Sequence, residues 1–188
     1  VEATSRLRKS VLMGEISNSS SVLLILAIVS RYDDAFTWTR NTTEPSWGRI
    51  ALESDVFEFT ETDYYEASMG SDLKKQFFAY EPPLDPADLS DIKRRTNAWE
   101  EEFADTSDFD VPRPLNLDPG YISLGKLVLA STKDHSHRIY LRDGIYAEVT
   151  LHYRSKGWQK SPWTYPDYQR DDFQAFFTQC REYLKSWC

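Results

Sequence analysis

The sequence predicts an α+β domain in which helices pack on a mixed β-sheet. Three observations favour this class. Residues 22–29 form a continuous apolar run rich in β-branched side chains, which is typical of a buried strand. Residues 85–103 carry apolar side chains at helical spacing, and residues 137–153 alternate as a β-hairpin does. Strands that alternate with helices before a hairpin indicate a ferredoxin-like core followed by a C-terminal hairpin and helix.

The first part of the domain is expected to alternate strands and helices. After the strand at 22–29, residues 33–40 predict a short helix, which its threonines weaken because threonine is a poor helix former. A proline and a glycine punctuate the end of that region. Apolar and aromatic residues then predict strands at 50–60 and 76–80, and a Pro-Pro pair ends the second of them.

The clearest predicted helix covers residues 85–103. Asp85 suits the N-cap position, and Pro86 suits the first position of the helix itself. The apolar positions fall three or four residues apart and therefore form one buried stripe: Leu89, Ile92, Thr96, Trp99 and Phe103.

Three further elements complete the predicted domain. Residues 115–122 are expected to be extended around a tight Asp-Pro-Gly turn at 118–120, because each of these residue types favours a bend. Residues 124–131 suit a short helix. Residues 171–187 predict a terminal helix, since their apolar side chains recur at helical spacing.

Composition bounds the organisation of the chain. Its 188 residues fit one globular domain, expected over residues 21–188, after a polar, aperiodic extension over residues 1–20 that we expect to be disordered. Both cysteines, Cys180 and Cys188, lie in the last nine residues, so a disulfide framework is not expected. The longest apolar run is too short to span a bilayer, and no signal-peptide pattern precedes it, so we expect a cytoplasmic location and no membrane partner.

The extension gives a first prediction. Deleting residues 1–18 should leave the melting temperature nearly unchanged, because a polar segment without periodicity buries little surface. Thermal unfolding of the shortened and full-length chains checks this, and a fall of several degrees would show that the segment packs on the domain.

Several function classes lack their signatures. The net charge is −8, which argues against a nucleic-acid partner, because such proteins present a basic surface. The only Gly-Lys pair, Gly125-Lys126, is followed by Leu127 where a P-loop has Ser or Thr, and the dinucleotide, zinc-protease and serine-hydrolase motifs are missing. With three histidines and no CxxC pair, no metal site is predicted, and no sequence motif indicates a particular cofactor.

The hairpin carries the most informative pattern. A three-residue loop at 142–144 with Gly144 at positive φ would separate an apolar face from a polar, aromatic one, whereas a two-residue loop would mix the two sets. The polar face would pair Tyr140 with Tyr146 and Arg138 with Glu148. This face is either the floor of a cleft or a structural ion pair with covered tyrosines, and the sequence leaves both interpretations open.

Two segments near the hairpin could complete a site. Residues 131–138 are dense in hydrogen-bond donors, including Lys133, His137 and Arg138, and are either an anion-binding loop or a solvated connection. Lys126 precedes this segment. The favoured interpretation of Asp118 is a turn residue, and the alternative is a carboxylate that transfers a proton or binds a metal.

Four stretches carry a resemblance to a known family: FEFTETDYY (57–65), IKRRTN (92–97), the region from NLDPGY (116–121) through HRIYL (137–141), and DGIYAEVTL (143–151) with PWTYPDY (162–168). Over roughly residues 22–185 the chain resembles the bacterial family known as domain of unknown function 4416. Residues 33–44 depart from the family pattern, which has a charged amphipathic helix where this chain is rich in threonine. The resemblance implies no established function.

The leading hypothesis is a domain that binds a small anionic or phosphorylated molecule, and the sequence leaves open whether it also acts on that molecule. Lys126, Lys133 and Arg138 would hold the anion beside Tyr140 and Tyr146. The candidate catalytic residues are Asp118, Glu148 and His137.

The alternative is a protein-interaction module that uses the exposed aromatic residues of the loop at 158–168. Binding of single-stranded RNA through these rings is a weaker third hypothesis, because the chain is acidic. A concave pocket joining Arg138, Glu148, Asp118 and Lys133 would favour the small ligand, and a flat apolar patch would favour the protein partner.

Overall fold

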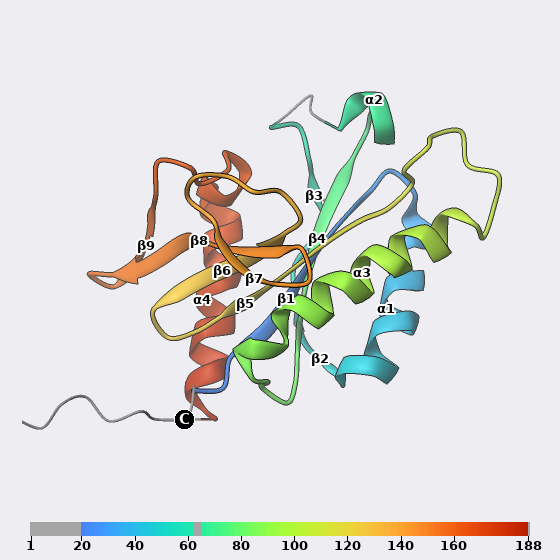
Figure 1. Cartoon of the computed structure of the whole chain (residues 1–188). Coiled ribbons are helices and arrows are strands. Elements are labelled where there is room, and N and C mark those ends of the chain that lie inside the picture. Colours follow the sequence, from blue (N-terminus) through green and yellow to red (C-terminus); the bar gives the residue numbers. More distant parts are fainter. Residues whose placement is uncertain (1–19, 62–64, 188) are drawn as a thin grey trace, which may run out of the picture.

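The computed structural model describes residues 20–61 and 65–187, so the predicted extension lies almost entirely outside the described residues. The described chain forms a nine-stranded sheet in the order β2-β4-β1-β5-β6-β8-β7, with β3 paired to β4 and β9 to β8 (Figure 1). The strands are β1 (Leu23–Ser30), β2 (Ile50–Glu53), β3 (Phe57–Glu58), β4 (Lys74–Tyr80), β5 (Asn116–Ile122), β6 (Lys126–Ser131), β7 (Ile139–Arg142), β8 (Ile145–Arg154) and β9 (Gly157–Lys160). The helices are α1 (Asp33–Trp47), α2 (Glu66–Met69), α3 (Leu89–Ala104) and α4 (Asp171–Lys185), with short 3-10 helices η1 (Pro86–Asp88) and η2 (Asp167–Gln169).

The predicted α+β class and ferredoxin-like core are confirmed. The chain runs β1-α1-β2-β4-α3-β5, and these four strands lie in the order β2-β4-β1-β5. Every strand pair among the described residues is antiparallel, so the sheet is not mixed as the sequence analysis expected. Each strand pair joined by a helix is separated by a third strand, and neighbouring strands therefore run in opposite directions.

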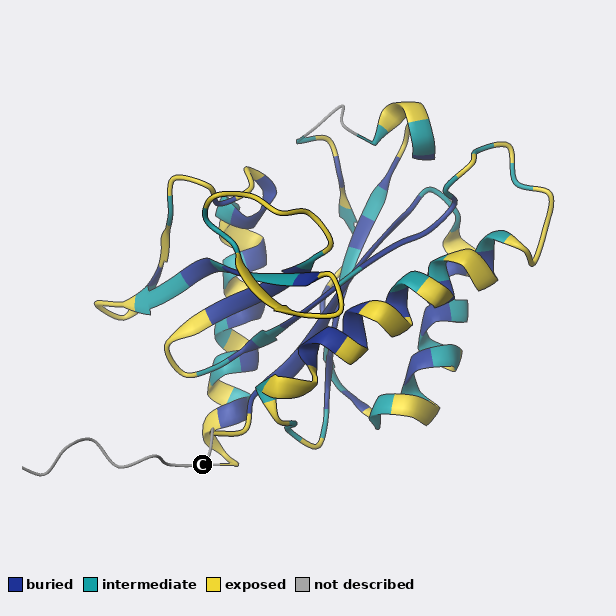
Figure 2. Ribbon diagram, in the orientation of Figure 1, coloured by how far each residue is buried: buried dark blue, intermediate teal, exposed yellow. Residues whose placement is uncertain are grey.

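The helices cover both faces of the sheet. One face of β1 packs with α1 and α3 in a cluster that includes Leu26, Phe36 and Trp99. The other face packs with α4 in a cluster that includes Ile25 and Phe177. Figure 2 shows the buried central strands between these layers. Because β1 is covered on both sides, its sequence is continuously apolar. No helix in the described part of the chain is long and apolar enough to cross a membrane.

The first helix and the strand after it differ from their predicted bounds. Helix α1 extends to Trp47, beyond the expected end at residue 40. The Thr39 hydroxyl donates to the Ala35 carbonyl at 2.7 Å and the Thr43 hydroxyl to the Thr39 carbonyl at 2.8 Å, so the buried threonines satisfy their hydroxyls within the helix. The single strand expected over residues 50–60 is divided into β2 and β3.

The helix predicted at 124–131 is wrong, because this segment forms β6. Leu127 and Leu129 pack in the cluster under α4, whereas Val128 and Ala130 pack on the opposite side near the start of α3. A short strand with both faces buried is uniformly apolar, and its sequence does not separate it from a buried helix.

The Asp-Pro-Gly turn predicted at 118–120 is also wrong. These residues lie inside β5, where Asp118 faces Ala27 and Pro119 faces Leu26 on β1. The ladder between β5 and β6 begins only at Gly120, so the nitrogen of Pro119 points to the side where β6 has separated. The strand therefore accommodates a residue without a backbone N–H.

The hairpin turn has two residues, where the sequence analysis expected three. Arg142 pairs with Ile145, and Asp143 and Gly144 have φ values of 54° and 76°, as in a type I′ turn. A register shift between Tyr140 and Arg142 bulges the strand at Leu141. The bulge restores the predicted pairing of Tyr140 with Tyr146. The apolar side chains of β8 are nevertheless divided, because Ile145, Ala147 and Val149 pack near α3 whereas Leu151 packs in the cluster under α4.

Gly120 gives a second prediction. A Cβ atom at Gly120 would lie 2.3 Å from the Val128 carbonyl oxygen, where β5 begins to pair with β6. Gly120→Ala should therefore lower the free energy of unfolding by about 1–3 kcal/mol, the usual cost of overpacking. Gly125→Ala is the matched control, because a Cβ there meets nothing within 4 Å. Denaturant titration measures both, and equal stability of the two variants would contradict the close packing.

Candidate functional site

The sheet opens between β5 and β6. These strands pair only from Gly120 to Ile122, and toward the start of β5 they separate. Helix α3 supplies the missing partners: Lys93 Nζ donates to the Leu117 carbonyl at 2.9 Å, and the Leu117 N–H donates to Glu100 Oε1 at 2.8 Å. Two charged side chains of α3 thus provide the backbone of Leu117 with the hydrogen bonds that a neighbouring strand would otherwise make.

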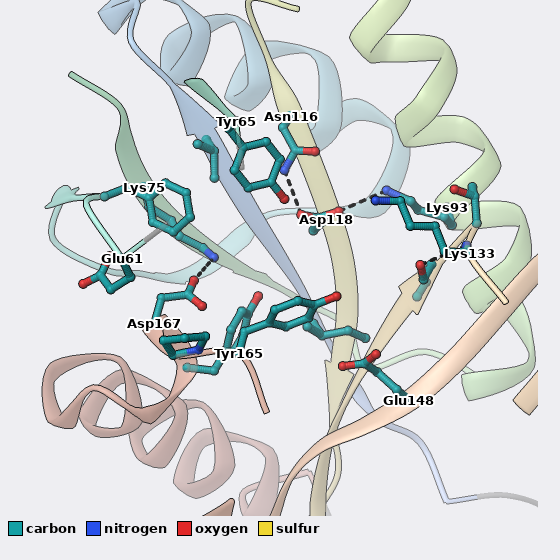
Figure 3. Close-up of a pocket in the computed structure, with 18 of the residues that line it drawn as sticks. Glu61, Tyr65, Lys75, Lys93, Asn116, Asp118, Lys133, Glu148, Tyr165 and Asp167 are labelled. Atoms are coloured by element: carbon teal, nitrogen blue, oxygen red, sulfur yellow. Dashed lines mark hydrogen bonds and ion pairs between the residues drawn. The ribbon is translucent and has the colours of Figure 1, made fainter. Parts of the chain in front are cut away.

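A cavity of about 290 Å³ lies at this opening. Figure 3 shows Glu61, Lys75 and Asp167 at one end and Lys93 and Lys133 at the other, with Asp118 between them. The lining brings together nine ionisable side chains of opposite sign and three tyrosines: Lys75, Lys93, Arg113, Lys133, Arg138, Glu61, Asp118, Glu148, Asp167, Tyr65, Tyr165 and Tyr168.

Asp118 is the central carboxylate of the cavity. Its Oδ1 lies 3.2 Å from Lys93 Nζ, and its Oδ2 accepts a 2.7 Å hydrogen bond from the Asn116 amide. Burial alone would raise the pKa of Asp118, but Lys93, the Asn116 hydrogen bond, Lys75 and Arg113 outweigh it and lower that pKa. Because its side chain is still 31% exposed, Asp118 is an ionised acceptor that a ligand can reach.

Arg113 and Glu100 brace the side of the cavity next to Asp118. Arg113 Nη2 donates to Glu100 Oε2 at 2.7 Å and also to the side-chain oxygen of Asn116. Burial raises the pKa of Glu100, although Lys93 and Arg113 oppose that shift. Asn116 thereby links the guanidinium of Arg113 to the carboxylate of Asp118, which orients both groups.

Lys75 and Asp167 form a buried ion pair at the opposite end. Lys75 Nζ lies 2.6 Å from Asp167 Oδ2, and the two side chains are only 4% and 6% exposed. Four aromatic rings surround the ammonium group at 4.5–5.7 Å from their centroids: Phe59, Phe77, Tyr168 and Phe173. The strand β4 positions Lys75, and η2 positions Asp167.

Arg138 and Glu148 form the second buried pair. Arg138 Nε donates to Glu148 Oε2 at 2.7 Å, with side-chain exposures of 3% and 1%, which confirms the predicted cross-strand contact. The Arg138 guanidinium also donates to the Ser131 hydroxyl, the Lys133 carbonyl and the Tyr165 hydroxyl at 2.7–3.0 Å. It therefore ties β6, the following loop and the loop before η2 to one buried carboxylate.

The structure gathers half of the sequence-derived site residues around the cavity. Asp118, Glu148, Lys133 and Arg138 line it. His137 is not part of the lining, although its Nε2 lies 3.2 Å from Glu148 Oε2.

Three predicted ligand-binding residues lie elsewhere. Lys126 is at the far end of β6, exposed and opposite His152. Tyr140 and Tyr146 contact each other with ring centroids 5.3 Å apart, toward the hairpin turn and away from the lining. Tyr140 and Tyr146 thus lie side by side as predicted, but at a part of the hairpin that extends beyond the cavity.

Sequence reasoning missed the charged residues contributed by β4, α3 and the segment before β5. Lys93 lies four residues after Leu89 on the buried side of α3, and Lys75 shares a strand face with Phe77. A lysine at a buried position of an otherwise apolar pattern was the available signal. Arg113 and Asp167 lie in irregular segments or short turns, where no periodicity marks them.

One family model matches the chain. It is described as Domain of unknown function (DUF4416) and covers residues 20–183. The chain belongs to this family. No curated protein and no solved structure matches this DUF4416 chain.

Two other predictions for this DUF4416 chain concern a metal site and the aromatic loop at 158–168. Within residues 20–61 and 65–187, no group of three or more His, Cys, Asp or Glu side chains is arranged to hold a metal ion. The aromatic loop is divided: Trp158 and Tyr168 are buried, whereas Trp163 and Tyr165 are 39% and 44% exposed. Two of the four aromatic side chains expected to contact a protein partner therefore belong to the core.

Proposed function

We propose that this protein binds a small molecule with an anionic group in the cavity at the β5–β6 opening. The convergence of cationic side chains from several separate elements carries this proposal. Among the described residues, five cationic side chains and four carboxylates line the cavity, although the whole chain has a net charge of −8. The lining thus carries one more cationic group than carboxylates, and this local excess favours an anion although the whole chain is acidic.

The anion is best placed at the end formed by Lys93 and Lys133. Lys93 uses two of its three N–H donors within the protein, on the Leu117 carbonyl and Asp118. Ser131 and Thr132 add hydroxyl groups to the same part of the lining. Lysines and hydroxyls that approach from several directions suit the multiple acceptor oxygens of a phosphate.

Binding is better supported than catalysis. A general base works best when its pKa lies near the working pH, whereas the pKa of Asp118 is lowered below its usual range. Glu148 already accepts from Arg138 and Thr150 and contacts His137, so it acts as an anchor for its neighbours. The cavity volume of about 290 Å³ is at the small end of ligand pockets, which favours a metabolite-sized molecule.

A lysine pair tests the proposal. Lys133→Ala should weaken the binding of a phosphate monoester such as ribose 5-phosphate by roughly tenfold, because a charged hydrogen bond contributes about 1.5–3 kcal/mol. Lys126→Ala removes the same charge from outside the cavity and should leave affinity unchanged. Both lysines are exposed, so neither change should alter the fold.

Isothermal titration calorimetry gives the affinities, and ligand-dependent thermal stabilisation gives an independent readout. A panel of inorganic phosphate, ribose 5-phosphate and small carboxylates that produces no stabilisation at millimolar concentration would refute the proposal. Equal loss of affinity in the two lysine variants would show that the anion binds to general surface charge.

A further inference from the structure

We infer that the molecule bound in this cavity is a phosphorylated polyhydroxyl compound, such as a sugar phosphate, with its hydroxyl groups at Asp118 in the centre of the cavity and at the end formed by Lys75 and Asp167. This inference rests on the proposed function and adds the chemical class of the uncharged part of the ligand. Its basis is that the two ends of the cavity differ in composition.

The end opposite Lys93 and Lys133 is polar but charge-balanced. Glu61 is paired with Arg170 at 2.6 Å, and Asp167 is paired with Lys75 at 2.6 Å. A carboxylate that already has a cationic partner gains little from a ligand ammonium group, because that group would face the partner's positive charge. Its remaining lone pairs still accept hydrogen bonds from neutral donors.

A hydroxyl group matches such a surface. It both donates and accepts, so it can bridge the acceptor and the donor of one fixed ion pair. Asp118 offers this combination, since its carboxylate is held charged by Lys93 and Asn116 while remaining 31% exposed. Carboxylate, amide and ammonium groups in close succession are therefore suited to a chain of hydroxyls.

Tyr168 supplies an independent observation. It lines the cavity, and its buried hydroxyl has no hydrogen-bond partner among the described residues. A buried hydroxyl without a partner is destabilising, and a ligand hydroxyl could satisfy it. Burial, together with the neighbouring charges of Asp167 and Asp118, raises the pKa of Tyr168, so this hydroxyl keeps its proton and can donate.

The decisive comparison uses two phosphate monoesters of five carbons each. Ribose 5-phosphate carries hydroxyls along its chain, and n-pentyl phosphate carries none. We expect ribose 5-phosphate to bind at least about tenfold more tightly, because a site built to hydrogen-bond hydroxyls rejects an analogue that lacks them. Phosphoethanolamine tests the ammonium alternative and should bind more weakly than ribose 5-phosphate.

Two variants assign the ends of the cavity. Asp118→Asn should weaken ribose 5-phosphate by about tenfold while changing the affinity for n-pentyl phosphate less than about twofold. Lys133→Ala should weaken both ligands together. If Asp118→Asn does not fold, Tyr65→Phe replaces it, since Tyr65 lines the same part of the cavity and loses only one hydroxyl.

The outcomes separate this inference from the proposed function. Equal affinity for n-pentyl phosphate and ribose 5-phosphate, or tighter binding of phosphoethanolamine, would overturn the polyhydroxyl assignment and leave the anion site intact. Absence of binding by all three phosphate monoesters would overturn the anion site itself. Loss of both ligands in Asp118→Asn, with the fold retained, would place Asp118 at the anion end and also overturn the assignment.

Discussion

Replacing Asp167 with Asn should lower the free energy of unfolding by about 3–5 kcal/mol, the typical cost of removing one partner from a buried ion pair. Asp167 is the carboxylate 2.6 Å from Lys75 Nζ, and both side chains are almost fully buried. The amide oxygen can still accept a hydrogen bond from Lys75, but the ammonium would lose its charged partner and depend on that neutral acceptor and the cation–π contacts. The ammonium would then retain only a fraction of its stabilisation.

A double substitution separates the ion pair from simple packing. Lys75→Met combined with Asp167→Asn removes both charges and should recover much of the lost stability, because a buried pair replaced by groups of similar size is often near neutral. Asp108→Asn makes the same chemical change in an exposed loop and is the control. Urea unfolding measures all four proteins. The buried-pair argument fails if Asp167→Asn destabilises the protein no more than Asp108→Asn does.

The order of elements was largely predictable from local patterns. The apolar run of β1, the apolar stripe of α3 and the alternation of the hairpin each have one dominant interpretation. Two errors share a cause, since β6 and the 118–120 segment obtain their strand conformation from neighbouring strands and not from their own sequence. Turn chemistry and periodicity are local, and here tertiary pairing overrides them.

The candidate site was predictable only where its residues are close in sequence. Arg138 and Glu148 are joined by one hairpin, so alternation along its strands identified the contact. Lys75 and Asp167 are separated by 92 residues, and Lys93 and Asp118 by 25, so their meeting depends on strand order and helix placement. A buried lysine in an apolar pattern signals that a partner exists, but sequence distance hides which residue it is.

Replacing Arg138 with Ala should lower the free energy of unfolding by about 3–5 kcal/mol and also impair the binding of ribose 5-phosphate. The sequence left open whether this residue lies on the floor of a cleft or in a structural ion pair, and in the structure its side chain is only 3% exposed. Removing it leaves the Glu148 carboxylate, 1% exposed, without its strongest partner. It also releases the Ser131, Lys133 and Tyr165 contacts that shape the anion end.

Arg138→Lys distinguishes a positioning role from direct contact with the ligand. Hydrogen bonds within the protein occupy four of the five N–H donors of the Arg138 guanidinium, so we expect Arg138 to act through Lys133 and not to grip the anion in bidentate fashion. The lysine variant keeps the charge but cannot reach all three segments, and it should lower the free energy of unfolding by about 1.5–3 kcal/mol. Arg142→Ala is the control, because Arg142 lies at the end of β7 with a half-exposed side chain and its loss should change stability little. Melting temperature and ribose 5-phosphate affinity, measured on the same folded samples, decide between the roles. Unchanged stability with a tenfold loss of affinity in Arg138→Lys would show that the guanidinium contacts the ligand directly, and the positioning role would have to be abandoned.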